Sequence, residues 1–253
     1  MYDASGTKQA DKNDINLPGL AGKRERAVIA APPSGTWRVT VKNTLGGLAP
    51  TSQRFAGVLD VARAEYAPLK DVDGLSAAQR AAIYQNIRSV VMSPTGNKFR
   101  PAQGVTRGEL AESLVLGARV PQYMPASASY RDVRNPLTQL FVESVQNAPQ
   151  GAIFTDVERG GAFSPNEAVG RLTAAVALVR AAGLQSEAEA AQTMPLTTIL
   201  DAGMIPSALR GYVRVAISRG FLSASNAYFR PQAPLTRLEL AQAMVAMQKL
   251  QAQ

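Results

Sequence analysis

The chain has 253 residues, of which 46% are hydrophobic and 18% charged, a composition typical of one or two folded domains. It contains no cysteine and no histidine, which excludes a disulfide framework, a thiolate metal site and a Ser-His-Asp or Cys-His triad. Because 27 Lys and Arg outnumber 19 Asp and Glu, the formal net charge is +8, which favours an anionic partner. A surplus that serves solubility alone explains the charge equally well.

The pattern of apolar and basic residues narrows the class of partner. Charges or prolines interrupt every apolar run, and none approaches the roughly 20 residues that a membrane-spanning helix needs. The basic residues are scattered, and no predicted helix gathers Lys and Arg on one face, which argues against nucleic acid. We therefore expect a non-catalytic module with no membrane span, no nucleic-acid partner, no metal and no cofactor.

Residues 1–64 differ in pattern from the rest of the chain. Short β-like runs are predicted over 25–31, 36–41 and 53–61. Three strands make too small a sheet to stand alone, so we expect a β-sandwich remnant or linker here. The first six residues contain neither a basic nor an apolar stretch, so they do not form a signal peptide. We expect the chain to be the later part of a longer, secreted protein.

The strongest pattern is an internal repeat with an offset of 130 residues. Between 69–115 and 199–245, 14 of 47 positions are identical without a gap. A weaker copy lies between them, and it has 31 residues from Asp132 to Phe163 where the other two copies have 28. We therefore expect a small insertion around 151–161. Self-similarity of this kind indicates repeated structural units that pack on one another.

Each copy is predicted to form a helix, a loop and a second helix. In the first copy, apolar residues at helical spacing predict a helix over 76–91, and Thr106 is expected to begin the next one. The predicted organisation is a β remnant at 1–64 followed by repeat 1 at 65–120, repeat 2 at 126–184 and repeat 3 at 194–253. One apolar face on each helix pair predicts that the three pairs pack around a common centre.

The second helix of repeats 1 and 3 begins with Thr-Arg-x-Glu. This spacing fits a capping box, in which the Thr hydroxyl accepts from the amide of the Glu and the Glu carboxylate accepts from the amide of the Thr. The predicted capping residues are Thr106, Glu109, Thr236 and Glu239. Repeat 2 has Gly170 and Thr173 at these positions and loses the box.

The arginine inside this element is not needed for capping. At the first helical position it is expected to point outward, beside free backbone N–H groups, where its fork binds a carboxylate or phosphate. The alternative is an ion pair with an aspartate of a neighbouring repeat, for instance Asp71, Asp132 or Asp201. Repeat 2 keeps its arginine although its cap has decayed, which favours a role beyond capping. The candidates are Arg107, Arg171 and Arg237.

These motifs resemble the S-layer homology family. Its repeats begin with an apolar residue, any residue, Asp and Val, as at 69–72, and continue to Phe-x-Pro, as at 99–101 and 229–231. A Thr-Arg-Ala-Glu signature follows, matched by 106–109 and 236–239, while repeat 2 departs from it with Gly-Arg-Leu-Thr at 170–173. The resemblance implies a mostly α fold of three helix-loop-helix repeats in a pseudo-threefold bundle with grooves between repeats.

The resemblance also implies a function. Family members bind acidic, often pyruvylated, cell-wall polysaccharide or peptidoglycan without a covalent bond. Carried over, the glycan-binding residues are the three arginines, with the capping residues beside them. The chain is then expected at the extracellular cell surface or wall.

A second resemblance concerns the N-terminal part. Residues 31–41 resemble the last strands of the β-sandwich that follows the catalytic domain of secreted subtilisin-like proteases. It implies an upstream catalytic domain in the same polypeptide. A β-hairpin extension unrelated to proteases is the alternative. For the repeats, the alternative to wall anchoring is a protein–protein or oligomerisation scaffold at the end of such a protease.

Overall fold

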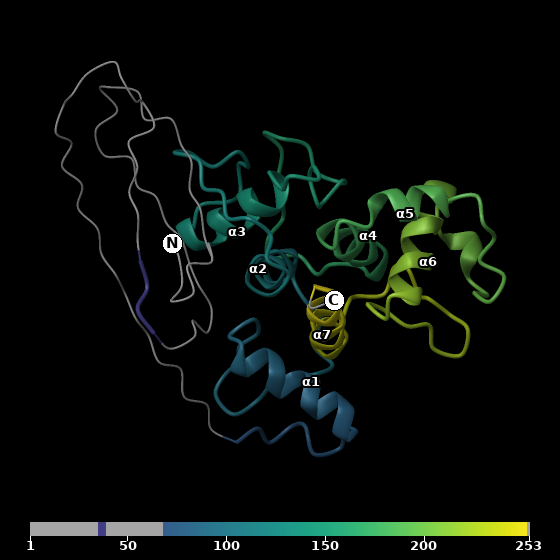
Figure 1. Ribbon diagram of the computed structural model, residues 1–253, viewed down its shortest axis with the longest axis horizontal. Coiled ribbons are helices and arrows are strands. Elements are labelled where there is room, and N and C mark those ends of the chain that lie inside the picture. Colours follow the sequence, from purple (N-terminus) through teal and green to yellow (C-terminus); the bar gives the residue numbers. More distant parts are fainter. Residues whose placement is uncertain (1–34, 39–67, 252–253) are drawn as a thin grey trace.

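The computed structural model describes residues 35–38 and 68–251, and the described part is mostly helical, as predicted (Figure 1). Its strand-like contacts are isolated bridges. The predicted β remnant lies outside the described residues except for 35–38, so the runs predicted there stay untested. The elements are α1 (Ala77–Arg88), α2 (Arg107–Gly117), α3 (Pro136–Gln146), α4 (Arg171–Ala181), α5 (Gln185–Ala190), the short 3-10 helices η1 (Ala202–Met204) and η2 (Ser207–Leu209), α6 (Arg210–Ser218) and α7 (Arg237–Gln251).

Local sequence explains where the helices begin. The hydroxyl of Ser76 accepts from the amide of Gln79 and completes a capping box before α1. Asn135 caps α3 through its side chain, and Pro136 takes the first helical position, where no amide is needed. The helix predicted over 76–91 ends sooner, at Arg88, because Val90 adopts a left-handed conformation (φ 57°) that turns the chain into the loop.

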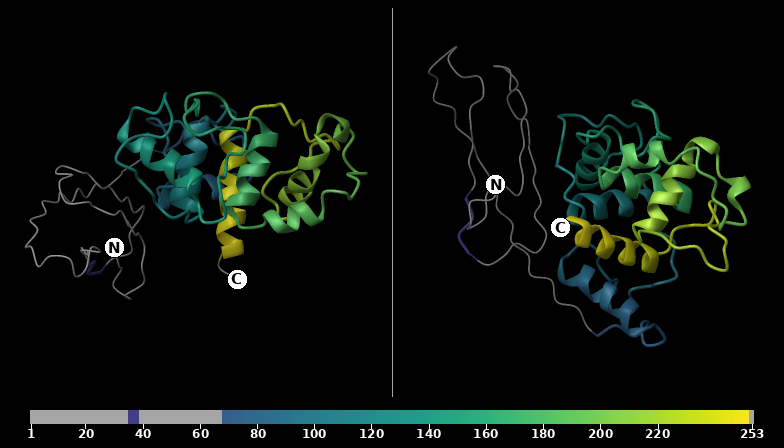
Figure 2. Two further views of the ribbon diagram at one scale, coloured as in Figure 1. Left: turned by 90° about the horizontal axis from the view of Figure 1, so that it is seen from above. Right: turned by 45° about the vertical axis from the view of Figure 1, so that its right-hand side comes forward.

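Helices from different repeats pack as pairs. The first helix of each repeat lies against the second helix of the repeat before it: α3 on α2, α6 on α4, and α1 on α7 (Figures 1 and 2). The last of these pairs joins the two ends of the repeat array. Each repeat therefore buries its apolar faces only with its neighbours, as repeated units require.

A ring of hydrogen bonds lies where the three second helices begin. The amide of Val105 donates to the carbonyl of Leu235 (2.8 Å), that of Leu235 to Val169 (2.9 Å), and that of Val169 back to Val105 (2.9 Å). All three side chains are buried. The pseudo-threefold axis was predicted for the whole bundle and stays a prediction. The three hydrogen bonds join the three repeats in a closed ring.

Apolar residues on the second helices fill the core. Leu114, Leu178 and Met244 occupy equivalent positions and are fully buried, as the predicted apolar faces require. Helix α5 was not among the helices expected from the sequence. It packs on α6, and the ideal Cβ position of Gly211 lies 1.8 Å from the carbonyl oxygen of Ala188. Only glycine allows this approach.

We expect Gly211→Ala to lower the free energy of unfolding by at least about 2 kcal/mol, because the new methyl group meets backbone that cannot rotate away. Gly203→Ala is the matched control, since the space around the Cβ of that exposed residue is open. Urea unfolding followed by circular dichroism measures both. Equal stability of the two variants would contradict the described contact between α5 and α6.

Candidate functional site

One arginine at the start of each second helix joins that helix to the loop of the next repeat. The Nε–H of Arg107 donates to the carbonyl of Phe163 (2.8 Å), that of Arg171 to Phe229 (2.7 Å), and that of Arg237 to Phe99 (2.8 Å). Each guanidinium also stands over the ring of the same phenylalanine, with its carbon 4.8–5.1 Å from the ring centre. Each arginine therefore contacts both the backbone and the phenylalanine side chain of the neighbouring loop.

The remaining guanidinium donors meet carboxylates and carbonyls. Arg237 pairs with Glu109 (3.2 Å) and donates to the carbonyl of Ser93 (2.8 Å). Arg171 pairs with Glu239 and donates to the carbonyl of Ser223 (2.6 Å). In both arginines the Nε and each of the two terminal nitrogens therefore have an acceptor. We call this arrangement the arginine clamp.

The structure corrects the expected orientation of these arginines. Arg107, Arg171 and Arg237 are 8%, 5% and 9% exposed, so they do not project into solvent as free forks. Burial lowers the pKa of the Arg237 guanidinium, and the negative charge of Glu109 opposes that shift. Arg107 and Arg237 were expected to contact the glycan directly as exposed side chains. Their burial removes the exposure on which that expectation depended.

The amides at the helix starts are not free either. The first two amides of α2 donate to the carbonyls of Glu167 and Pro165, and the equivalent amides of α4 and α7 donate to loop carbonyls in the same way. The predicted anion site at these helix N-termini is wrong because the neighbouring repeat already supplies the acceptors.

The alternative, an ion pair with a neighbouring repeat, is confirmed, but the carboxylates are Asp156, Glu239 and Glu109 and not the three aspartates given as examples. Asp71 accepts from the amides of Phe99 and Arg100 (2.9 and 2.7 Å), and Asp201 accepts from those of Phe229 and Arg230 (2.8 and 2.7 Å). Asp132 holds the loop of repeat 2 in the same way. The aspartate fixes the backbone that the clamp then grips, so its function is to anchor the loop.

This anchor holds one residue of each loop in a left-handed conformation. The residue after the phenylalanine has φ 59° at Arg100, 57° at Ser164 and 56° at Arg230. Non-glycine residues seldom adopt such angles, and where the surroundings enforce them they cluster at functional positions. In repeats 1 and 3 the residue so placed is an exposed arginine.

In repeat 2 an aspartate from a loop takes the place of the missing capping glutamate. Thr173 stands where the other repeats have the capping glutamate, so Arg107 lacks that partner. Asp156 takes its place and accepts from both terminal nitrogens of Arg107 (2.8 and 3.0 Å). Asp156 comes from the loop in which the sequence predicted an insertion. The signal was present, since the copy that loses the glutamate is the copy that gains residues.

The capping boxes are confirmed. Thr106 and Glu109 exchange both hydrogen bonds, and so do Thr236 and Glu239. Gly170 provides no side-chain cap. Each glutamate therefore serves twice, as a cap for its own helix and as the partner of the arginine from the repeat before it.

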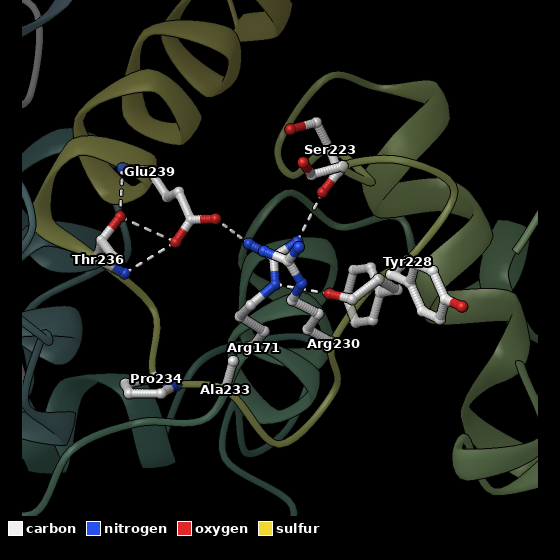
Figure 3. Close-up of a pocket in the computed structure, with 10 residues that line it drawn as sticks. Arg171, Ser223, Tyr228, Arg230, Ala233, Pro234, Thr236 and Glu239 are labelled. Carbon is white, nitrogen blue, oxygen red and sulfur yellow. Dashed lines mark hydrogen bonds and ion pairs between the residues drawn. The ribbon is translucent and has the colours of Figure 1, made fainter. Parts of the chain in front are cut away.

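A groove of about 190 Å³ opens beside the clamp of Arg171 (Figure 3). We call it the repeat-3 groove, and its principal lining residues are Arg171, Ser223, Tyr228, Arg230, Thr236 and Glu239. In Figure 3, Arg171 lies between Tyr228 on one side and Thr236 with Glu239 on the other. The buried arginine forms a wall, while Arg230 and Tyr228 are exposed.

The equivalent surface of repeat 1 carries Lys98 and Arg100, both exposed and without an ion pair or hydrogen bond from their side chains within the described part of the chain. We call it the repeat-1 surface, after its exposed residues Lys98 and Arg100. Arg100 and Arg230 were missed as site residues. Their identity at the 130-residue offset was the available signal.

Residues 68–251, with 35–38, contain no group of three acidic side chains placed to hold a metal ion. Within the same residues, no helix is long and apolar enough to cross a membrane.

Comparison with known proteins agrees with the repeat pattern. The model of the S-layer homology domain matches two segments, residues 68–111 and 198–241. These segments fall in repeats 1 and 3, the two copies that share the Thr-Arg-x-Glu element. Domains of this class anchor proteins to cell-wall polymers. A search of curated proteins found no match.

We expect Arg237→Ala to lower the free energy of unfolding by about 2–4 kcal/mol, because it leaves the buried carbonyl of Phe99 without its donor and Glu109 without its ion pair. Arg100→Ala removes the same charge from an exposed position and should change stability by less than about 0.5 kcal/mol. Urea unfolding of both variants measures the difference. An Arg237→Ala variant as stable as the parent would show that the clamp is not structural.

The loop anchor predicts a pH dependence. Although desolvation opposes it, the hydrogen bonds from the Phe163 and Ser164 amides lower the pKa of Asp132 below its ordinary value near 3.8. The carboxylate therefore stabilises the fold above that value, and the contribution is lost as the pH falls through the lower, folded-state pKa. We expect Asp132→Asn to be less stable than the parent at pH 6 and the gap to shrink towards pH 3. Asp73→Asn is the control, and a gap independent of pH would contradict the anchor.

Proposed function

We propose that this chain is a non-catalytic, extracellular anchoring module that binds an anionic cell-wall glycan, either an acidic polysaccharide or peptidoglycan. The match of the S-layer homology domain to repeats 1 and 3 is the observation that carries this proposal. Both of these repeats present an exposed arginine, Arg100 or Arg230, on a loop fixed by an aspartate and by the arginine clamp.

The geometry supports a redistribution of roles among the predicted site residues. Arg171 and Arg237 hold the loops in place, and Arg171 forms the wall of the repeat-3 groove. Arg230 and Arg100 then supply the accessible guanidinium, whose planar fork matches a sugar carboxylate. Because the backbone behind each fork is already fixed, little ordering entropy is lost when a ligand binds.

Two exposed arginine sites on one bundle favour binding to a polymer. A polymer that occupies one site is held near the other, so the second contact forms at a high effective concentration. Modest affinity at each site is then enough for stable attachment to a wall in which the same glycan recurs.

The proposal extends to the parent protein. We propose that these repeats form the C-terminal part of a larger secreted protein and that residues 1–64 lead from an upstream catalytic domain. The support is the resemblance of residues 31–41 to the end of a subtilisin-associated β-sandwich. The full-length coding sequence tests this point.

We expect the chain to be retained on purified wall sacculi that keep their accessory polymer. Arg100→Ala/Arg230→Ala should raise the apparent dissociation constant at least about tenfold, because two charge-assisted contacts are lost. The control is Arg88→Ala/Lys249→Ala, which removes two exposed charges near the C-terminal ends of α1 and α7. Co-sedimentation with sacculi measures all three proteins.

Three outcomes decide the proposal. Loss of retention in the groove variant but not in the control supports it. Equal retention of both variants would remove the two exposed arginines from the site. Failure of the parent to sediment with sacculi would reject wall anchoring and favour the scaffold alternative, which sedimentation equilibrium of the free chain would then test.

A further inference from the structure

The repeat-3 groove and the repeat-1 surface carry different side chains at equivalent positions. Three loop positions are compared: the residue before the anchoring aspartate, the residue before the clamped phenylalanine, and the left-handed residue after that phenylalanine. Repeat 1 has Lys70, Lys98 and Arg100 at these positions, whereas repeat 3 has Leu200, Tyr228 and Arg230. Two cations are thus exchanged for two large apolar side chains, while the arginine is kept.

The apolar pair of repeat 3 is exposed. Leu200 is 67% exposed and Tyr228 is 45% exposed, and they are two of only five large hydrophobic side chains that are exposed among the described residues. The amide of Leu200 donates to the carbonyl of Ala227 (2.8 Å), which places the backbones of these two positions side by side. Tyr228 lines the repeat-3 groove together with Arg230 (Figure 3).

Hydrogen bonds define the backbone that carries this pair. Ser225 and Tyr228 exchange both backbone hydrogen bonds (3.0 Å each) across a two-residue turn, and Asn226 and Ala227 adopt the positive φ values of 51° and 63° that such a turn requires. The anchor of Asp201 fixes the next two residues. The tyrosine ring is therefore presented at a defined place beside the guanidinium of Arg230.

The equivalent turn of repeat 1 carries a lysine where repeat 3 has the tyrosine. Thr95 and Lys98 exchange the same two hydrogen bonds (3.0 and 3.2 Å), so Lys98 occupies the position of Tyr228. Lys70, Lys98 and Arg100 are all exposed, and their side chains form no ion pair within the described residues. Arg100 lies near enough to Arg237 to contribute to the lowered pKa of that buried guanidinium, after burial itself.

We infer that the repeat-3 groove and the repeat-1 surface recognise different parts of one wall polymer. The repeat-3 groove holds a singly charged pyranose, with its C–H face on Tyr228 and its carboxylate at Arg230, and Leu200 lies beside this groove. The repeat-1 surface holds a more highly charged group of the phosphate class among Lys70, Lys98 and Arg100. This inference rests on the proposed function and adds the class of ligand that each site takes.

Physical chemistry separates the two sites. An exposed aromatic ring next to one arginine favours a ligand with one apolar face and one negative charge, because the ring gains from contact with C–H groups and desolvates no further cation. Three free cations around one loop favour a ligand with two charges, and their contribution is screened by salt. Binding at the repeat-1 surface should therefore weaken more steeply with ionic strength than binding at the repeat-3 groove.

The test uses two probes on the full, isotope-labelled chain. Glucuronic acid is a singly charged pyranose, and inorganic phosphate carries up to two charges at neutral pH. We expect glucuronic acid to shift the amide resonances of Tyr228 and Arg230 in a saturable way, and phosphate to shift those of Lys98 and Arg100. Leu200→Lys/Tyr228→Lys should raise the dissociation constant for glucuronic acid roughly tenfold and create phosphate binding at repeat 3.

Tyr228→Phe is the matched control, since it keeps the ring and should bind glucuronic acid within about twofold of the parent. If both probes shift both loops equally, or if neither probe binds, the division between the two sites is overturned. Sedimentation of the parent with sacculi separates this failure from failure of the proposed function: a parent that binds sacculi without discriminating the probes remains an anchor with equivalent sites.

Discussion

The fold depends on a buried arginine that grips the loop of the next repeat. Its Nε–H donates to a phenylalanine carbonyl, its plane covers the phenylalanine ring, and at least one of its terminal nitrogens pairs with a carboxylate. Burying such a charge is costly unless its nitrogens have partners. Each of the three clamps meets that condition, Arg171 and Arg237 with equivalent partners and Arg107 with Asp156. Because one clamp faces each boundary between repeats, the clamps specify which repeat contacts which.

This constraint separates two groups of arginine that the sequence does not distinguish. The buried group builds the loops, and the exposed group, Arg100 and Arg230, is positioned by them. A ligand site made in this way has a stable frame and an accessible charge. The same separation lets the two sites diverge, since Lys98 and Tyr228 lie on equivalent turns and can differ without disturbing the clamps behind them.

Much of the fold was predictable from local pattern. Apolar spacing indicated the second helices, and the Thr-x-x-Glu spacing indicated their caps, because both signals lie within one helix. The direction of the arginine was not predictable in this way. Arg237 meets Phe99 and Ser93 from across the chain, and no local rule places those carbonyls at the helix start.

The site could be predicted only in part, for the same reason. The Thr-Arg-x-Glu element located the groove but named the residues that build it as its ligands. The anchoring aspartates looked like partners for the arginines, yet they bind amides of their own loops. Asp156 illustrates the limit well, since an insertion was visible in the sequence while its purpose, to replace one lost carboxylate, required the arrangement in space.

Arginine side-chain resonances test the account most directly. Nitrogen-detected spectra of the labelled chain resolve the Nε–H groups, with and without soluble polymer released from sacculi. The account predicts that the Nε–H groups of Arg107, Arg171 and Arg237 exchange slowly with water and do not shift, while those of Arg100 and Arg230 exchange rapidly when free and shift on binding. Rapid exchange in the first group, with shifts confined to it, would contradict the account.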